Sequence, residues 1–344
     1  MHTVLIHCNA STEIGFGHLF RCLALADALR RNQLLSVAFA MAESPAGFER
    51  IREQGFPLFT WSSDRGMTRE EWLQETLQQS GSRILLLDLR DPLHPDFIRQ
   101  CRSRGLVLAG LDDLTATRCL MDLLFSPPLF DPEELSWEGF TGTHYHGWEW
   151  VVLRPEFRPP APRPENRPPR ILVTMGGSDP AGLTEQAVQA LCLAGGGFQA
   201  DIVLGPGFPR EGKVRELLQE ACFLYQLHRN ATDMATRMAS ADMAVASFGM
   251  TAYELAAMGV PALYLCLTPV HHTRARGFAA QGLARNLGLY NRVIPEEFAM
   301  EIHQLAVSRD RRLSMKQAAQ QKELGSGADR VAARIADALR AGRQ

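Results

Sequence analysis

Short apolar runs and amphipathic segments alternate along this chain, and the same order occurs in both halves. In the first half the apolar runs have strand length, and the segments between them repeat apolar residues at helical spacing. We expect strands at 4–6, 34–40, 84–88, 106–110 and 121–125, and helices at 18–31, 46–54, 69–79 and 93–103. This alternation predicts a parallel sheet that helices cover on both faces.

The second half repeats the pattern after a proline-rich interruption. Strands are expected at 171–175, 200–204, 222–226, 242–246 and 261–266, helices at 182–194, 211–220, 231–239, 250–258 and 273–282, and a wholly helical tail at 296–344. The interruption, Pro155 to Pro169, can neither continue a helix nor pair inside a sheet. We therefore predict an α/β chain with two doubly wound, Rossmann-like domains that face a cleft, at 1–155 and 170–325, an extended linker at 156–169, and a last helix at 326–344.

Composition and charge are those of a globular protein. With 344 residues, a net charge of −2 and 46% hydrophobic residues, neither nucleic acid nor a charged membrane surface is an expected partner. The seven cysteines form no Cys-x-x-Cys pair, which predicts neither a zinc site nor a disulfide framework and favours a cytoplasmic location. No basic leader precedes Val4, and no apolar run reaches the length of a membrane span.

The most informative motif is Gly15-Phe16-Gly17-His18, between a predicted strand and a predicted helix. The glycines allow a tight turn and bring backbone amides close to a ligand. His18 falls in the first helical turn, where unpaired N–H groups and the helix dipole attract anions and favour a neutral imidazole. His18 is therefore the candidate general base, the alternative being a turn without a ligand and a histidine facing solvent. Phe20 excludes a dinucleotide fingerprint, which needs a third glycine there.

Two further glycine loops follow strands in the second half. Gly176-Gly177-Ser178 offers amides and a hydroxyl for a diphosphate, and we expect Asp179 as the helix cap and Pro180 at the first helical position. The alternative is an ordinary capped turn. In Ser247 to Glu254, the serine and Gly249 are expected near a phosphate or the ribose, with the glutamate accepting hydrogen bonds from the ribose hydroxyls. The alternative there is a capping box, Thr251-x-x-Glu254.

Carboxylates and histidines elsewhere are weaker candidates. Asp112 and Asp113 follow the strand at 106–110, where they would bind a sugar or orient His18, or form a turn. Asp88 and Arg90 end the strand at 84–88 in the same way.

Two histidine pairs remain. One of His271 and His272, before a predicted helix, is expected to face the cleft. His144 and His146 lie in an aromatic segment and lack a third metal ligand, so we interpret them as structural.

The run from Ile14 to Ala26 resembles the G-x-G-H-x-x-R-C-L-x-L-A signature of the UDP-sugar hydrolases of pseudaminic acid biosynthesis, which act on UDP-2,4-diacetamido-2,4,6-trideoxy-β-L-altropyranose. Related spore-coat polysaccharide proteins share this motif. Gly176 to Pro180 with Thr184 resembles the family's second motif. Ser247 to Glu254 resembles the third, which is shared with the lipid-linked GlcNAc transferase of peptidoglycan synthesis. The resemblance covers nearly the whole chain and implies a GT-B fold, with UDP held mainly by the second domain and the last helix packed on the first.

The resemblance also implies roles for single residues. It makes His18 the catalytic group, and it implies metal-independent hydrolysis of a UDP-linked amino or deoxy sugar at the anomeric carbon, with no cofactor and with other enzymes of a glycan pathway as partners. The candidate substrate-binding residues are Asn9, Gly15, Gly17, Arg21, Asp88, Asp113 and His271, and the candidate UDP-binding residues are Gly176, Gly177, Ser178, Ser247, Gly249, Thr251 and Glu254.

This chain departs from the family pattern on the sugar side. It has His7-Cys8-Asn9 where the family begins with Arg-x-Asp, Arg90 where the family has a tyrosine, and Val270-His271 where the family has Asn-Gln. The motifs on the UDP side are kept. The alternatives are therefore a GT-B glycosyltransferase that uses a UDP-sugar donor, and a non-catalytic protein that binds a nucleotide sugar.

Overall fold

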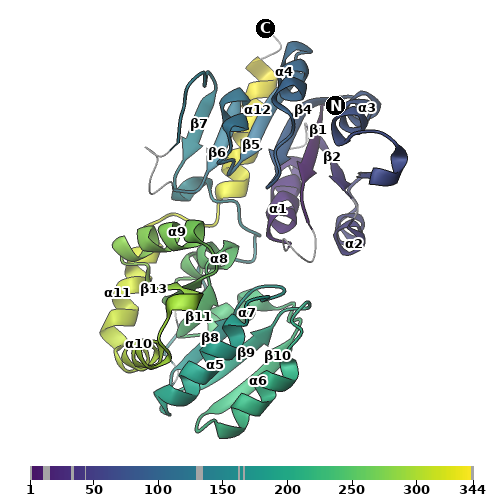
Figure 1. Cartoon of the computed structure of the whole chain (residues 1–344). Coiled ribbons are helices and arrows are strands. Elements are labelled where there is room, and N and C mark those ends of the chain that lie inside the picture. The colour runs from purple at the N-terminus through teal and green to yellow at the C-terminus, as the bar shows by residue number, and fades with distance from the viewer. Residues whose placement is uncertain are drawn as a thin grey trace. The chain divides into compact units, whose positions relative to one another are not determined.

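The chain forms two compact units, each built around one parallel sheet (Figure 1). The computed structural model describes residues 2–10, 16–31, 35–42, 44–128, 135–161, 163–165 and 167–341. The first unit contains Met1–Pro155 and Gly325–Gln344, and the second contains Glu156–Leu324. In Figure 1 the C-terminal helix, in yellow, lies among the purple and blue elements of the first unit.

The first unit has a seven-stranded sheet in the order β3-β2-β1-β4-β5-β6-β7, all parallel. The strands are β1 His2–Cys8, β2 Leu35–Ala42, β3 Leu58–Trp61, β4 Ser82–Asp88, β5 Val107–Leu111, β6 Leu123–Ser126 and β7 Thr143–His146. The helices are α1 Gly17–Arg31, α2 Pro45–Glu53, α3 Arg69–Ser80, α4 Pro95–Ser103 and α12 Gly327–Ala341. Because the order reverses between β1 and β4, these two strands form the switch point of a doubly wound sheet.

The second unit repeats this topology with six parallel strands in the order β10-β9-β8-β11-β12-β13. The strands are β8 Arg170–Thr174, β9 Gln199–Leu204, β10 Leu224–Arg229, β11 Met243–Ser247, β12 Ala262–Cys266 and β13 Ala284–Leu289. The helices are α5 Leu183–Ala194, α6 Glu211–Leu217, α7 Met234–Ser240, α8 Met250–Ala257, α9 Pro269–Ala280, α10 Pro295–Val307 and α11 Arg309–Gln320. Its switch point lies between β8 and β11.

Both faces of the first sheet are buried, which explains the uninterrupted apolar strand pattern. Successive side chains of a strand point to opposite faces. In β1, Val4 and Ile6 belong to the core formed with α1, α2 and α12, and Leu5 belongs to the core formed with α3 and α4. Helix α12 enters the first of these cores through Val331 and Ile335, one helical turn apart.

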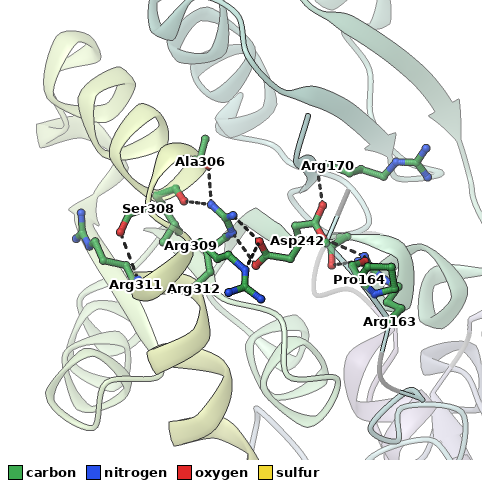
Figure 2. A network of polar contacts seen from close by, with 12 residues as sticks. Arg163, Pro164, Arg170, Asp242, Ala306, Ser308, Arg309, Arg311 and Arg312 are labelled. Carbon is green, nitrogen blue, oxygen red and sulfur yellow. Dashed lines mark hydrogen bonds and ion pairs between the residues drawn. The ribbon is translucent and has the colours of Figure 1, made fainter. Parts of the chain in front are cut away.

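Most of the proline-rich segment belongs to the second unit, and ion pairs hold it against the rest of that unit (Figure 2). Arg163 donates to Asp242 at 3.0 Å and to carbonyl groups at the end of α7. Glu165 accepts from Arg312 at 2.9 Å. Arg312 also donates to Ala306 O, at the C-terminal end of α10. Arg163 and Glu165 therefore hold the described part of this segment against the rest of the second unit.

Each strand and helix predicted before residue 296 is found at or near its predicted position. The structure has three further strands, and the prediction for the C-terminal tail is wrong. Strands β3, β7 and β13 were not predicted, and β7 contains His144 and His146. The prediction of a wholly helical tail is wrong, because residues 321–326 separate α11 from α12. Within the described ranges, no helix is both long and apolar enough to cross a membrane.

Candidate functional site

The first candidate site lies at the switch point of the first sheet. Cys8 and Asp88 are paired at the carboxyl ends of β1 and β4, and α1 begins at Gly17 after the β1 loop. His18 therefore stands in the first turn of α1 as predicted. Residues three and four positions further along a helix share its face, so Arg21 and Cys22 point to the same place. Gly15 lies outside the described residues.

Asp88 is the centre of this group. Its Oδ1 lies 2.6 Å from His18 Nδ1, and its Oδ2 accepts from Arg21 Nε at 2.5 Å. Arg21 Nη2 also donates to Oδ1, and the Cys22 thiol donates to Oδ2 at 3.3 Å. The Asp88 side chain is 0% exposed and that of His18 is 19% exposed. A buried carboxylate thus joins a partly exposed imidazole to a buried guanidinium.

The charges around Asp88 determine its ionisation. Burial by itself would raise the pKa of Asp88, but the positive charge of Arg21, the charge of His18 and their hydrogen bonds hold it well below its usual range. Asp88 is therefore a carboxylate at neutral pH and can only accept hydrogen bonds. Because Asp88 can only accept, the 2.6 Å contact requires a proton on His18 Nδ1.

The other sequence candidates of the first unit that the structure describes have hydrogen-bond partners within the protein. Asp113 accepts from the Thr115 amide and hydroxyl and from the Thr117 hydroxyl, each at 2.7 Å, so it caps the turn after β5. The expectation that Asp112 or Asp113 orients His18 is wrong, because Asp88 does so. Asn9 accepts from the Arg90 amide at 3.0 Å and so joins the ends of β1 and β4.

The aromatic segment of β7 is a packed cluster. His144 Nε2 lies 3.2 Å from Ser126 Oγ, and the His144 ring lies 4.6 Å from that of Trp137 and 5.2 Å from that of His146. Burial, together with the charges of His146 and Arg118, lowers the pKa of His144 to about 4. Among the described residues, no group of three or more His, Cys, Asp or Glu side chains could hold a metal ion.

The second candidate site lies at the switch point of the second sheet. Gly176 has a φ of +84°, which favours glycine, and follows β8. A Cβ at Gly176 would lie 3.9 Å from Ser247 Oγ at the end of β11, so the two glycine loops are neighbours. A Cβ at Gly205 would come within 2.3 Å of the carbonyl oxygens of Gly176 and Gly177. The first loop therefore rests directly on the backbone after β9.

Helix α5 starts later than predicted, and the reason lies in the contacts of Asp179. Its carboxylate accepts from the amides of Leu183 and Thr184, both at 2.8 Å, and α5 begins at Leu183. The N-cap of α5 is Gly182, so the predictions that Asp179 is the N-cap and that Pro180 takes the first helical position are both wrong, although Asp179 does accept from two amides of the first turn. Asp179 therefore occupies the first two amides of α5.

The loop after β11 leads into α8 without the capping box that was the alternative interpretation of its sequence. Gly249 is the N-cap of α8, which begins at Met250. The alternative prediction, a capping box, is wrong. A capping box needs its threonine at the N-cap, just before the helix, whereas Thr251 is the second residue of α8. Glu254 lies one turn further along. The buried Phe248 packs its ring 6.2 Å from that of His271, which brings the start of α9 to the same edge.

The comparisons with known proteins agree with this architecture. No family model matches the chain. It is 25% identical over 279 residues to the uncharacterised protein MJ1062 of Methanocaldococcus jannaschii, which is 76% of this chain and 55% of that protein. It is 30% identical over 204 residues to the spore coat polysaccharide biosynthesis protein SpsG of Bacillus subtilis, which is 56% of this chain and 58% of that protein. The chain thus spans little more than half the length of these relatives.

Solved structures show the fold. MurG of Acinetobacter baumannii has a TM-score of 0.74 at 16% identity, covering 98% of this chain and 99% of that one. A putative UDP-N-acetylglucosamine 2-epimerase of Listeria monocytogenes has a TM-score of 0.70 at 16% identity, covering 98% and 96%. An S. aureus MnaA structure with UDP has a TM-score of 0.69 at 12% identity, covering 99% and 97%. The prediction of a GT-B fold is confirmed, and the chain is a sequence relative of SpsG.

Sequence reasoning missed how Arg21 and Cys22 are used. Both were visible three and four residues after His18, and a buried arginine on an apolar helix face requires a carboxylate partner. What the pattern of residues could not reveal is which of the strand-end carboxylates is that partner.

Proposed function

We propose that this protein hydrolyses a UDP-linked amino or deoxy sugar at its anomeric carbon, without a metal ion, and releases UDP. The observation that carries this proposal is the His18–Asp88 pair at 2.6 Å, at the switch point where doubly wound sheets bind ligands. The resemblance to the hydrolases of pseudaminic acid biosynthesis and the sequence similarity to SpsG support a sugar nucleotide as the substrate.

In the proposed reaction a water molecule attacks the anomeric carbon. His18 Nε2 takes a proton from that water as the new carbon–oxygen bond forms. The bond between the anomeric carbon and the β-phosphate oxygen breaks, and its electron pair leaves with UDP. Asp88 stabilises the imidazolium that forms and keeps the ring oriented through Nδ1–H. The products are the free sugar and UDP, and the imidazolium then loses its proton to solvent.

The second unit would hold the nucleotide. The amides at Gly176 to Ser178 and the hydroxyl of Ser247 lie at one switch point and offer donors to a diphosphate. Glu254, one turn into α8, would accept from the ribose hydroxyls. Donors fixed before the reaction stabilise the charge that develops on the leaving diphosphate.

The test is release of UDP from a panel of UDP-sugars without an acceptor. The wild-type chain should release UDP and free sugar in equal amounts from at least one of them. His18→Asn should lower the turnover by roughly 10²–10⁴-fold, and should leave UDP affinity unchanged. The exposed His303 is a matched control, and His303→Asn should behave as wild type.

Other outcomes identify the alternatives. UDP release that occurs only after addition of a sugar or peptide acceptor would replace hydrolysis by glycosyl transfer. Tight UDP binding without release from any UDP-sugar, with or without an acceptor, would leave a binding protein. Full turnover in the His18→Asn variant would remove His18 as the base.

A further inference from the structure

Arg21 is a buried cation whose donors face carboxylates of the protein. It is 8% exposed. Its Nε and Nη2 donate to the two oxygens of Asp88, and its Nη1 lies 3.6 Å from Asp112 Oδ2. The guanidinium thus bridges the ends of β4 and β5. A side chain held in this way has little surface with which to contact a sugar.

We infer that Arg21 is a positioning residue, which acts on His18 through Asp88, and not a residue that binds the sugar. This inference rests on the proposed function, because it assigns a task to Arg21 in the same site. It replaces the substrate-binding role that the sequence motif suggested for Arg21.

The first task of Arg21 is geometric. A guanidinium that donates from Nε and one Nη presents a planar fork that matches both oxygens of a carboxylate. This contact fixes the rotation of the Asp88 carboxylate and so fixes the direction from which Oδ1 meets His18 Nδ1. Arg21 Nη2 lies 3.1 Å from that nitrogen because both groups donate to the same oxygen. A lysine in place of Arg21 keeps the charge but offers no planar fork.

The second task concerns protons. The titratable groups of the described chain that face Asp88 are His18, Arg21 and Cys22 on α1, with Cys8 on β1 beside Cys22 and Asp112 beyond Arg21. Burial raises the pKa of the Cys22 thiol, so Cys22 remains a neutral donor. Arg21 is therefore the permanent positive charge that offsets this buried carboxylate.

Removal of that charge should add a proton to the His18–Asp88 pair. Burial disfavours an isolated carboxylate, so without Arg21 the pair would hold an extra proton, on Asp88 or as an imidazolium at His18. Either form prevents His18 from accepting a proton from water. The acid limb of the pH profile of kcat should then move to higher pH, by roughly one to three pH units.

The experiment compares Arg21→Met and Arg21→Lys with the wild-type chain. Arg21→Met should shift the acid limb of kcat upward and, at pH values below both acid limbs, lower kcat by roughly 10–1,000-fold, since one pH unit is a factor of ten, with KM nearly unchanged. Arg21→Lys keeps the charge, so its acid limb should move by less than half as much. The matched control is Arg334→Met, which should change nothing, because Arg334 is exposed and its ion pair is with the equally exposed Asp337.

A second readout does not depend on turnover. In a sample with ¹⁵N-labelled histidine rings, assigned by the loss of signals in His18→Asn, the wild-type His18 should show a protonated Nδ1 and an unprotonated Nε2. In Arg21→Met, Nε2 should carry a proton at the same pH, whether the extra proton makes His18 an imidazolium or neutralises Asp88. If Arg21→Met does not fold, the ring signals of Arg21→Lys are compared instead. If no UDP-sugar is hydrolysed while these ring signals behave as expected, the proposed function fails and the role of Arg21 stands.

Two results would overturn the inference. One is a folded Arg21 variant whose acid limb and His18 ring signals match those of the wild-type chain. The other is a rise in KM at unchanged kcat and unchanged pH profile, which would return Arg21 to sugar binding.

Discussion

The replacement of Asp88 by asparagine separates the structural task of this carboxylate from its catalytic task. Asp88→Asn keeps the shape of the side chain but removes the charge that faces Arg21 and the acceptor that fixes His18 Nδ1. The amide has only one oxygen, so it cannot accept from Arg21 and His18 as the two carboxylate oxygens do. Both the stability of the first unit and the turnover should therefore fall.

The expected loss of stability follows from burial. Breaking a buried ion pair from one side costs roughly 3–5 kcal/mol, because the other charge is left without its partner. Asp112 Oδ2, 3.6 Å from Arg21, still offsets part of that charge, so we expect the lower end, about 3 kcal/mol. For a unit of this size, this corresponds to a fall of roughly 6–12 °C in Tm. Turnover should fall by roughly 10²–10⁴-fold, as for loss of the base.

The assay is scanning calorimetry together with UDP release. If the two units unfold separately, only the transition of the first unit should move in Asp88→Asn. His18→Asn serves as the comparison. Its ring is partly exposed and asparagine can still donate to Asp88, so its Tm should remain near that of the wild-type chain while turnover falls. A wild-type Tm and wild-type turnover in Asp88→Asn would refute the reasoning.

Three further predictions follow from other parts of the structure. Burial, partly offset by the hydrogen bond to Ala40, lowers the pKa of His7 from 6.5 to about 4. The unfolded chain therefore binds the extra proton between these values, and stability should fall by up to about 3 kcal/mol as pH drops from 6.5 to 4. Thermal unfolding against pH tests this, and His7→Gln should flatten the slope. Gly205→Ala should push a Cβ against the loop at Gly176 and weaken UDP binding at least tenfold by calorimetry, whereas Gly212→Ala, with open space around it, should not. Glu254→Ala should weaken UDP binding by about tenfold, the effect of losing about 1.4 kcal/mol, and unchanged UDP binding in this variant would leave Glu254 without its ribose role.

Much of the architecture could be predicted from the sequence because it depends on local periodicity. Apolar runs of strand length, such as Val4 to Ile6, and helical repeats such as Leu19 to Leu29 determine which segments become strands and helices. The position of His18 in the first turn of α1 follows from the same local pattern. So does the placement of the loops at Gly176 and Ser247 after strands.

The tertiary structure decided which residues meet. Asp88 and Asp113 both follow apolar strands, but only the strand order puts β4 beside β1, and so Asp88 beneath His18. The start of α5 at Leu183 depended on where the buried Asp179 carboxylate could reach, which overruled the preference of Pro180 for a first turn. These are contacts between segments far apart in sequence or set by burial, and no local repeat records them.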